Sequence, residues 1–290
     1  MTTSQTPIQA SAAGTITIGG DLTVNRMGFG AMRITGEGIW GPPKDHDEAI
    51  RVLRRALELG VNFIDTADAY GPNVSEDLIA EALHPYPAGL VIATKGGLIR
   101  TGPGQWPQDG RPEHLREALE GSLQRLKLDR IDLYQYHRPD PKVPIEDAIG
   151  ALVELQQQGK IRHIGVSNFN SDQLAQARKI ATIVSVQNRY NASDRQDEDV
   201  LETCTRDGLA FLPWAPVASG DLARPGGPLD QAATRHGVTQ SQIALAWLLH
   251  RSPMMLPIPG TSSVTHLEEN VAAAAIKLTA EEFAVLDQQQ

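Results

Sequence analysis

Residues 60–71 read GVNFIDTADAYG, and this stretch contains the pattern that decides the fold. Gly60 follows a helical pattern over residues 47–59, where a left-handed helix cap is expected. The short apolar run at 62–64 predicts a buried strand, and polar residues follow it at once. A helix that ends at glycine, a short apolar strand and a polar loop are typical of a parallel sheet covered by helices.

The same unit recurs along the chain. We expect strands at 26–29, 62–64, 90–94, 131–135, 162–166, 183–187, 209–213 and 254–258, and helices at 47–59, 75–83, 112–127, 145–158, 171–180, 197–206, 228–236 and 240–250. Eight such units over about 260 residues match an α/β fold of the (β/α)8 TIM-barrel type. The rival is an open doubly wound sheet, which usually has a glycine-rich phosphate turn after its first strand. Gly28 and Gly30 lack the third glycine of that turn.

The segment before the first unit has two parts. Residues 15–24 alternate apolar and polar around Gly19-Gly20-Asp21, which predicts an N-terminal β-hairpin. Residues 1–13 are small and polar, and we expect a disordered tail there. No later segment breaks the composition sharply, so residues 14–290 are predicted to form a single domain.

Composition narrows the class of protein. Lys and Arg number 26 against 35 Asp and Glu, a net charge of -9, so nucleic acid is not an expected partner. An anionic cofactor would need a local positive site against this average field. Cys204 is the only cysteine, which fits a reducing compartment. Neither a secretory signal pattern nor an apolar run near the roughly 20 residues of a membrane span is present. We therefore expect a cytoplasmic protein without membrane contact, and the oligomeric state stays open.

In a barrel of this type, residues just past the carboxyl ends of the strands converge on one mouth. The residues at those positions are mostly polar or aromatic, and they are Asp65, Asp68, Tyr70, Lys95, His137, Ser167, Asn168, Gln187, Asn188 and Trp214.

Four of these residues suggest proton transfer to a carbonyl oxygen. A free tyrosine titrates near pKa 10, and a nearby ammonium such as Lys95 is expected to lower the pKa of Tyr70. A buried lysine needs a carboxylate such as Asp65 to stay charged. His137 could donate a hydrogen bond to the same substrate oxygen. Taken singly, Asp65 could cap a loop, Tyr70 could be a rim aromatic and His137 could bind a backbone carbonyl. Together they occupy successive strand ends and favour catalysis.

Five segments carry a resemblance to a known family: residues 60–71, 93–95, 129–137, 159–169 and 186–191. With them the chain resembles the aldo-keto reductases over nearly its whole length. The resemblance implies a catalytic tetrad of Asp65, Tyr70, Lys95 and His137, with Tyr70 as the general acid that reduces aldehydes or ketones to alcohols. It also implies NADP(H), bound extended across the barrel mouth without a Rossmann domain.

The cofactor residues follow from the same resemblance. Ser167, Asn168 and Gln187 would hold the nicotinamide carboxamide, to which their donors and acceptors are suited, and Trp214 would stack on the nicotinamide ring. The remaining expected contacts are Gly30, Ala31 and Met32 at the first strand, Ala215, Pro216, Val217, Gly220 and Leu222 around the pyrophosphate, and Gly260, Thr261, Ser262, Ser263, His266, Glu269 and Asn270 around the adenosine phosphate.

The sequence departs from the better-known pattern at two of these positions. Gly260 stands where many members have lysine, and His266 stands where many have arginine, which grips phosphate in a bidentate manner that histidine cannot match. NADPH is expected over NADH, although these departures weaken the reason for it. Trp40 and Trp106 lie in long loops and are candidates for a substrate pocket. Alternatively, they are exposed or packed on each other.

Three functions remain open at this point. The first is an enzyme that reduces aldehydes and ketones. Residues 257–263, PIPGTSS, resemble bacterial members that include pyridoxal reductases, so a pyridoxal-type aldehyde is one candidate substrate. The second is a cofactor-sensing regulatory subunit, because potassium-channel β-subunits resemble this family too. The third is a metal-dependent barrel hydrolase, but no closely spaced His and Asp set supports it and no metal is predicted.

Overall fold

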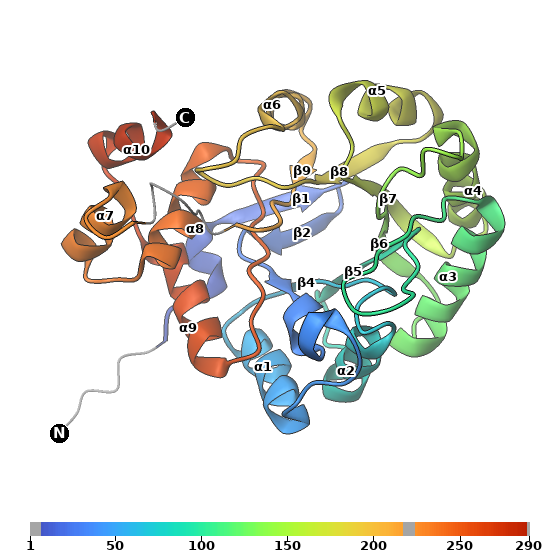
Figure 1. The fold of residues 1–290 in the computed structure, drawn as a ribbon, viewed down its shortest axis with the longest axis horizontal. Coiled ribbons are helices and arrows are strands. Elements are labelled where there is room, and N and C mark those ends of the chain that lie inside the picture. Colours follow the sequence, from blue (N-terminus) through green and yellow to red (C-terminus); the bar gives the residue numbers. More distant parts are fainter. Residues whose placement is uncertain (1–6, 217–223, 289–290) are drawn as a thin grey trace.

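The computed structural model describes residues 7–216 and 224–288. Its main sheet has seven parallel strands that are neighbours in chain order. These strands are β3 (Phe29–Gly30), β4 (Phe63–Asp65), β5 (Val91–Gly96), β6 (Ile131–Tyr136), β7 (Ile161–Ser167), β8 (Ile183–Gln187) and β9 (Ala210–Phe211). The sheet curls round on itself and helices surround it (Figure 1).

Within the described residues, eight helices lie close to their predicted ranges, and they are α1 (His46–Glu58), α2 (Val74–Leu83), α3 (Pro112–Leu126), α4 (Ile145–Gln157), α5 (Ser171–Ile180), α6 (Glu198–Asp207), α7 (Pro228–His236) and α8 (Gln240–Arg251). Two further helices, α9 (Val264–Ala272) and α10 (Ala280–Asp287), had no predicted range. Local chemistry explains the boundaries. Thr239 forms a capping box at the start of α8, and Asn170 does the same for α5. Gly60 has φ 77°, which confirms the left-handed cap after α1.

The barrel closes between the two ends of the chain. On one side of the closing segment, Leu256 N–H donates to Phe211 O at 2.9 Å. On the other side, Gly28 N–H donates to Pro257 O at 2.9 Å, and Gly30 N–H donates to Pro259 O at 3.3 Å. Residues 254–259 therefore occupy the eighth barrel position between β9 and β3. We call this line of contact between residues 28–30 and 257–260 the seam.

The prediction of a regular strand at 254–258 is wrong. The chain takes the predicted path, but only an isolated parallel bridge between Phe211 and Met255 is formed there. Pro257 and Pro259 have no N–H, so they accept hydrogen bonds from Gly28 and Gly30 but cannot donate the bonds that would complete a ladder. The closed barrel is confirmed, with an eighth position that is joined by few bonds.

The hairpin forms the floor of the barrel. It consists of β1 (Thr15–Ile18) and β2 (Leu22–Asn25), which pair antiparallel as predicted. Its apolar side chains, Ile16, Ile18, Leu22 and Val24, pack with the inward-facing residues of the strands, including Phe63, Ala93 and Leu133. Asp21 in the turn binds Arg162 and His163 at the start of β7. The barrel is thus filled from below, and its opposite end remains open.

The tail prediction is wrong for part of residues 1–13. Ala10–Ala13 form the 3-10 helix η1. Ala10 is fully buried, and its N–H donates to Leu59 O at 2.8 Å. Small residues suit this position because the helix packs closely beside the end of α1. Residues 1–6 lie outside the described ranges. Within those ranges, no helix is both long enough and apolar enough to span a lipid bilayer.

Candidate active site

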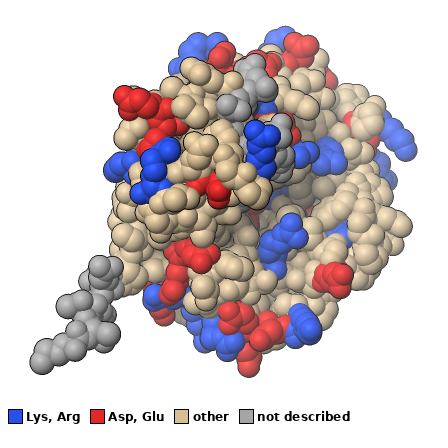
Figure 2. Space-filling model, turned by 60° about the vertical axis from the view of Figure 1, so that its left-hand side comes forward, with Lys and Arg blue, Asp and Glu red and all other residues tan. Residues whose placement is uncertain are grey.

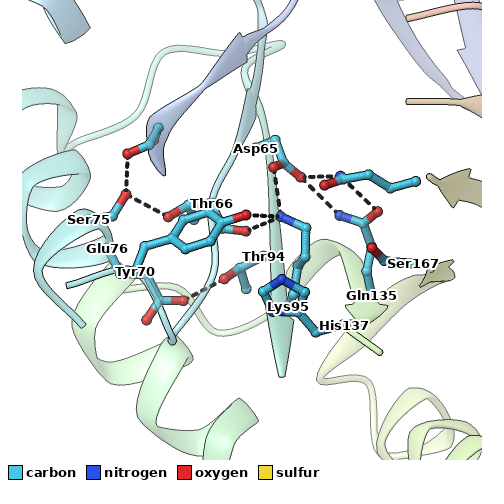
Figure 3. A network of polar contacts seen from close by, with 12 residues as sticks. Asp65, Thr66, Tyr70, Ser75, Glu76, Thr94, Lys95, Gln135, His137 and Ser167 are labelled. Atoms are coloured by element: carbon cyan, nitrogen blue, oxygen red, sulfur yellow. Dashed lines mark hydrogen bonds and ion pairs between the residues drawn. The ribbon is translucent and has the colours of Figure 1, made fainter. Parts of the chain in front are cut away.

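Three successive strands bring four polar side chains to the open end of the barrel (Figure 3). Asp65 ends β4, Lys95 lies near the end of β5, His137 follows β6, and Tyr70 lies in the loop before α2. Lys95 Nζ is 2.7 Å from Asp65 Oδ2, 2.8 Å from Thr66 O and 3.2 Å from Tyr70 Oη. The three donors of the ammonium therefore have three acceptors, and the predicted Asp65–Lys95–Tyr70 chain is present.

The carboxylate has further support that was not predicted from the sequence. Asp65 Oδ1 accepts from Gln187 Nε2 at 2.8 Å and from Gln135 Nε2 at 3.1 Å. Gln135 is fully buried inside β6. Its position within a strand indicates which face of the sheet its side chain is on, but not that the side chain contacts Asp65. The two amides and the ammonium together compensate a carboxylate that is 2% exposed.

The ion pair keeps the lysine charged. Burial by itself lowers the pKa of Lys95, but the nearby Asp65 and Tyr70 raise it by more, and the net pKa lies above the ordinary value. Lys95 is 0% exposed, so an uncompensated ammonium there would be costly. We infer that the ammonium is permanent under ordinary conditions.

The expected lowering of the Tyr70 pKa is wrong in net direction. Burial raises the pKa of the phenol above its ordinary value, and the opposing effect of Lys95 does not offset it. The reason is that Tyr70 is only 6% exposed and Asp65 adds a further raising effect. Tyr70 therefore stays protonated at neutral pH, as a proton donor must before it reacts.

His137 is neutral. Burial, together with the charges of Lys95 and Arg138, holds the pKa of His137 well below its ordinary value. Its ring meets the Tyr70 ring edge to face, with centroids 5.8 Å apart. Its Nδ1 is buried and has no hydrogen-bond partner among the described residues. A neutral imidazole donates a hydrogen bond through one nitrogen and accepts one through the other.

A second buried network lies behind the tetrad and was not predicted. Glu76 of α2 is fully buried, accepts from Thr94 Oγ1 at 2.6 Å and pairs with Arg125 Nε at 2.7 Å. Thr94 directly precedes Lys95, so the network ties β5 to α2 and α3. Burial, with a smaller contribution from Glu76, raises the pKa of Asp68 well above its usual range. Asp68, one of the strand-end residues, does not line the cavity described below, and its backbone N–H donates to Lys95 O at 3.3 Å.

A cavity of about 780 Å³ opens above the tetrad. Figure 2 shows a hollow in the surface with Lys and Arg side chains around it. Most of the predicted site residues line the cavity, namely Gly30, Met32, Asp65, Tyr70, Trp106, His137, Ser167, Asn168, Gln187, Trp214, Ala215, Pro216, Gly260, Thr261, His266, Glu269 and Asn270. Arg33, Leu98, Arg138, Thr239, Ser241, Ile258 and Pro259 also line it and were not predicted.

Other predicted residues do not line the cavity. Lys95 lies beneath it, and Ala31 is buried, with its carbonyl accepting from Ser75. Ser262 and Ser263 precede α9, but the N–H of Val264 at this helix start already donates to Glu48 at 3.0 Å. The Glu48 carboxylate therefore already occupies one of the helix N-terminal N–H groups that could otherwise bind an anion. Val217, Gly220 and Leu222 lie outside the described residues.

Of the two loop tryptophans, only Trp106 lines the cavity. Both rings contact Arg100, whose guanidinium lies 3.6 Å from the centroid of Trp106 and 5.5 Å from that of Trp40. The same guanidinium donates to the carbonyls of Ile39 and Ala69. Trp40 is therefore part of a brace that holds two loops together, and Trp106 is held edge-on to Tyr70 with centroids 6.5 Å apart.

Four polar groups on one side of the cavity form a connected set. Asn168 Nδ2 donates to Ser167 Oγ at 3.0 Å and to His137 O, and its Oδ1 accepts from Trp214 Nε1 at 3.2 Å. Asn168 has φ 59°, an uncommon conformation for a residue other than glycine and one often found at functional sites. The Ser167 hydroxyl keeps its proton to donate, and Gln187 Oε1 can accept. This donor and acceptor pair matches a primary carboxamide.

The seam explains why glycine stands at position 260. A Cβ added there would lie 2.6 Å from Gly30 O, and one added at Gly30 would lie 2.5 Å from Ile258 O. No side chain fits without moving the backbone, so the lysine of the better-known pattern is excluded. Arg33 lies beside Gly260 and has no hydrogen bond or ion pair with a described residue. It supplies a positive charge at this end of the cavity.

We predict that Gly260→Ala destabilises the protein by about 1–3 kcal/mol, because the added methyl group presses on backbone. Urea unfolding measures the change. Gly150→Ala is the matched control, since a Cβ there meets nothing within 4 Å and the residue lies within α4. This control should be neutral or stabilising. Equal stability of the two variants would contradict the steric account of the seam.

The barrel with this tetrad at its open end defines a class of oxidoreductase that handles carbonyl groups. A model of the Aldo/keto reductase family matches residues 26–290, and the chain belongs to this family. It is 53% identical over 99% of its length to an uncharacterized oxidoreductase of Schizosaccharomyces pombe, covering 94% of that protein. It is 45% identical over 92% of its length to a pyridoxine 4-dehydrogenase of Escherichia coli, covering 96% of it.

Solved structures agree. An aldo/keto reductase of Klebsiella pneumoniae, crystallised with NADP and acetate, is 27% identical and superposes with a TM-score of 0.81, covering 94% of each chain. The open doubly wound sheet is therefore excluded, and the predicted family and barrel are confirmed.

Proposed function

We propose that the protein reduces aldehydes or ketones to alcohols with NADPH. The observation that carries this proposal is the position of Lys95 Nζ, which lies 2.7 Å from Asp65 and 3.2 Å from Tyr70 Oη at the base of the open cavity. This arrangement holds a protonated phenol beside a fixed positive charge, where a carbonyl oxygen can accept its proton.

The residues present fit a nicotinamide cofactor. Ser167 and Gln187 offer the donor and acceptor of a carboxamide, and the ring of Trp214 borders the same cavity. The cavity continues past the seam to His266 and Asn270, where Arg33 supplies a cation for a phosphate. The Klebsiella pneumoniae relative, crystallised with NADP, supports the same choice of cofactor.

The chain's own groups account for the proton. When bound, the nicotinamide supplies a hydride to the carbonyl carbon. As negative charge develops on the carbonyl oxygen, Tyr70 Oη–H would donate its proton to that oxygen. Lys95 would stabilise the phenolate that remains, because its ammonium stays charged beside Asp65. A neutral His137 would orient the oxygen without competing as an acid.

Other functions receive less support. The pyridoxine 4-dehydrogenase of Escherichia coli is 45% identical, which keeps a pyridoxal-type aldehyde as a candidate substrate. A subunit that only senses the cofactor would not need a complete proton-donating group of residues. Here Lys95 contacts both Asp65 and Tyr70, and the rings of Tyr70 and His137 meet edge to face. Among the described residues no cluster of His, Cys, Asp and Glu favours a metal-dependent hydrolase. A cytoplasmic location stays a prediction.

A cofactor-consumption screen tests the function. NADPH absorbance is followed with a set of aldehydes, ketones and pyridoxal, and the screen is repeated with NADH. We expect turnover of at least one carbonyl class with NADPH and weaker turnover with NADH. Tight NADPH binding without turnover of any carbonyl compound would favour the sensing subunit instead.

We also predict that NADPH quenches tryptophan fluorescence mainly through Trp214. Its indole lines the cavity next to Ser167 and Asn168, so a nicotinamide held there would lie near it. Trp214→Phe should remove most of the NADPH-induced change. Trp40→Phe is the control, because Trp40 does not line the cavity. A full quench in the Trp214 variant would refute this contact.

A further inference from the structure

Arg138 is a cavity residue to which the reaction described above gives no task. It directly follows His137 in the loop after β6, is half-buried and lines the cavity. Within the described ranges it makes no hydrogen bond and no ion pair. A guanidinium carries five N–H donors in a planar fork, and leaving these unpaired away from water is unfavourable. The side chain is therefore suited to a ligand that brings its own acceptors.

Two other arginines near the cavity already have partners among the described residues, whereas Arg138 and Arg33 have none. Arg100 donates to the carbonyls of Ile39 and Ala69 at 2.8 and 2.9 Å and stacks on Trp106. Arg189 pairs with Asp194 at 2.9 Å. Arg33 lies elsewhere in the cavity, at the seam beside Gly260 and toward the residues expected to hold the cofactor phosphates.

The backbone that carries Arg138 is held firmly beside the tetrad. His137 N–H donates to Gly96 O at 2.9 Å, and His137 O accepts from Asn168 Nδ2 at 3.0 Å. The charge of Arg138 acts on the neighbouring imidazole. Burial is the main cause of the lowered His137 pKa, and the charges of Lys95 and then Arg138 lower this pKa further. The guanidinium therefore acts close to the place where the carbonyl group would react.

The surrounding wall fits a substrate with one charged end. Leu98 and Trp106 add apolar surface to the cavity lining, and the Trp106 ring lies edge-on to Tyr70 with centroids 6.5 Å apart. Among the described lining residues the only acids are Asp65 and Glu269, and Asp65 is compensated by Lys95. No lining carboxylate near His137 is thus free to neutralise Arg138.

We propose that Arg138 binds an anionic group of the substrate, a carboxylate or a phosphate, while the carbonyl of the same molecule lies at Tyr70 and His137. The enzyme then selects anionic aldehydes or ketones over their neutral analogues. This inference rests on the proposed carbonyl reduction and names its substrate class. The planar fork matches either anion in a bidentate manner.

Two substrate pairs test the proposal with NADPH. The carboxylate arm compares 4-carboxybenzaldehyde with its neutral methyl ester, and the phosphate arm compares pyridoxal 5′-phosphate with pyridoxal. In the wild-type enzyme we expect kcat/KM to favour the anionic member of at least one pair by about 10- to 100-fold, the value of a charged hydrogen bond. The arm that shows the preference identifies the anion.

The variants assign this preference to the side chain. Arg138→Gln should lower the anionic-to-neutral ratio by about tenfold or more, and Arg138→Lys should retain part of it because the charge remains. Lys142→Met is the matched control. It removes a positive charge from the same loop, but Lys142 is exposed and does not line the cavity, so the ratio should stay as in the wild type. Circular dichroism checks that each variant is folded.

The failures can be told apart. Wild-type reduction of the neutral members without any anionic preference would overturn the role of Arg138 and leave the proposed function standing. An unchanged anionic-to-neutral ratio in Arg138→Gln would also overturn the role of Arg138. If the KM for NADPH rose in that variant while the ratio stayed the same, Arg138 would bind the cofactor and not the substrate. Absence of turnover with every member of both pairs would sink the proposed function itself and this inference with it.

Discussion

Tyr70→Phe should lower kcat for carbonyl reduction by about 10²–10⁴-fold, the usual contribution of a positioned general acid. The change removes one oxygen, whose only hydrogen bond among the described residues is the one from Lys95 at 3.2 Å. The ring keeps its edge-on contacts with Trp106 and His137. Packing should therefore persist, and only the proton donor is lost. Stopped-flow or steady-state NADPH oxidation measures the effect.

Cofactor binding provides the control for this variant. The Ser167, Gln187 and Trp214 side chains are untouched by Tyr70→Phe, so the NADPH affinity measured by fluorescence should stay near that of the wild type. Turnover comparable to the wild type would refute Tyr70 as the acid. A parallel loss of NADPH affinity would show that the phenol serves binding in place of proton transfer.

Lys95→Met should be costly for both stability and activity. It leaves the Asp65 carboxylate buried with only the amides of Gln135 and Gln187, and breaking a buried ion pair typically costs about 3–5 kcal/mol. It also removes the charge that opposes the burial-raised pKa of Tyr70, so the phenol becomes a weaker acid and kcat should fall. Urea unfolding and NADPH oxidation measure the two effects.

A double-mutant cycle separates the ion pair from the loss of side-chain volume. Asp65→Asn alone leaves the ammonium uncompensated, whereas the double variant leaves no charge unpaired. We expect the double variant to be less destabilised than the sum of the single variants. Additive costs would mean that the 2.7 Å contact contributes little. In that case the stability of the site would depend on packing alone.

Most of the strands, and the end of the barrel at which the four polar side chains meet, were predictable from short apolar runs and the polar residues that end or follow them. Asp65, Lys95 and His137 each follow or end a short apolar run, and parallel strands in a barrel place such residues at one mouth. The hairpin was predictable from alternation around Gly19 and Gly20. The helix caps at Gly60 and Thr239 followed from local chemistry alone.

The features that were missed depend on contacts across the fold. The inward direction of Gln135 toward Asp65 is set by strand register, which no local pattern shows. The net pKa of Tyr70 depends on how fully the folded protein excludes water from it. Trp40 and Trp106 look equivalent in sequence, and only the fold shows that Trp106 lines the cavity beside Tyr70 whereas Trp40 does not. Proline recurs at 257 and 259, and this pattern could have warned that no regular strand forms there.

The seam has a consequence for how the protein matures. Residues 28–30 and 257–260 are joined by contacts of very large sequence separation, and we expect these contacts to form late in folding because a long loop must close first. The cavity is lined from both sides of this junction, by Gly30 and Arg33 from early in the chain and by Gly260 and Asn270 from late in it. A chain without residues 257–270 would therefore lack one wall of this cavity. A dinucleotide bound there would contact both the first and the last units of the ring and would hold them together.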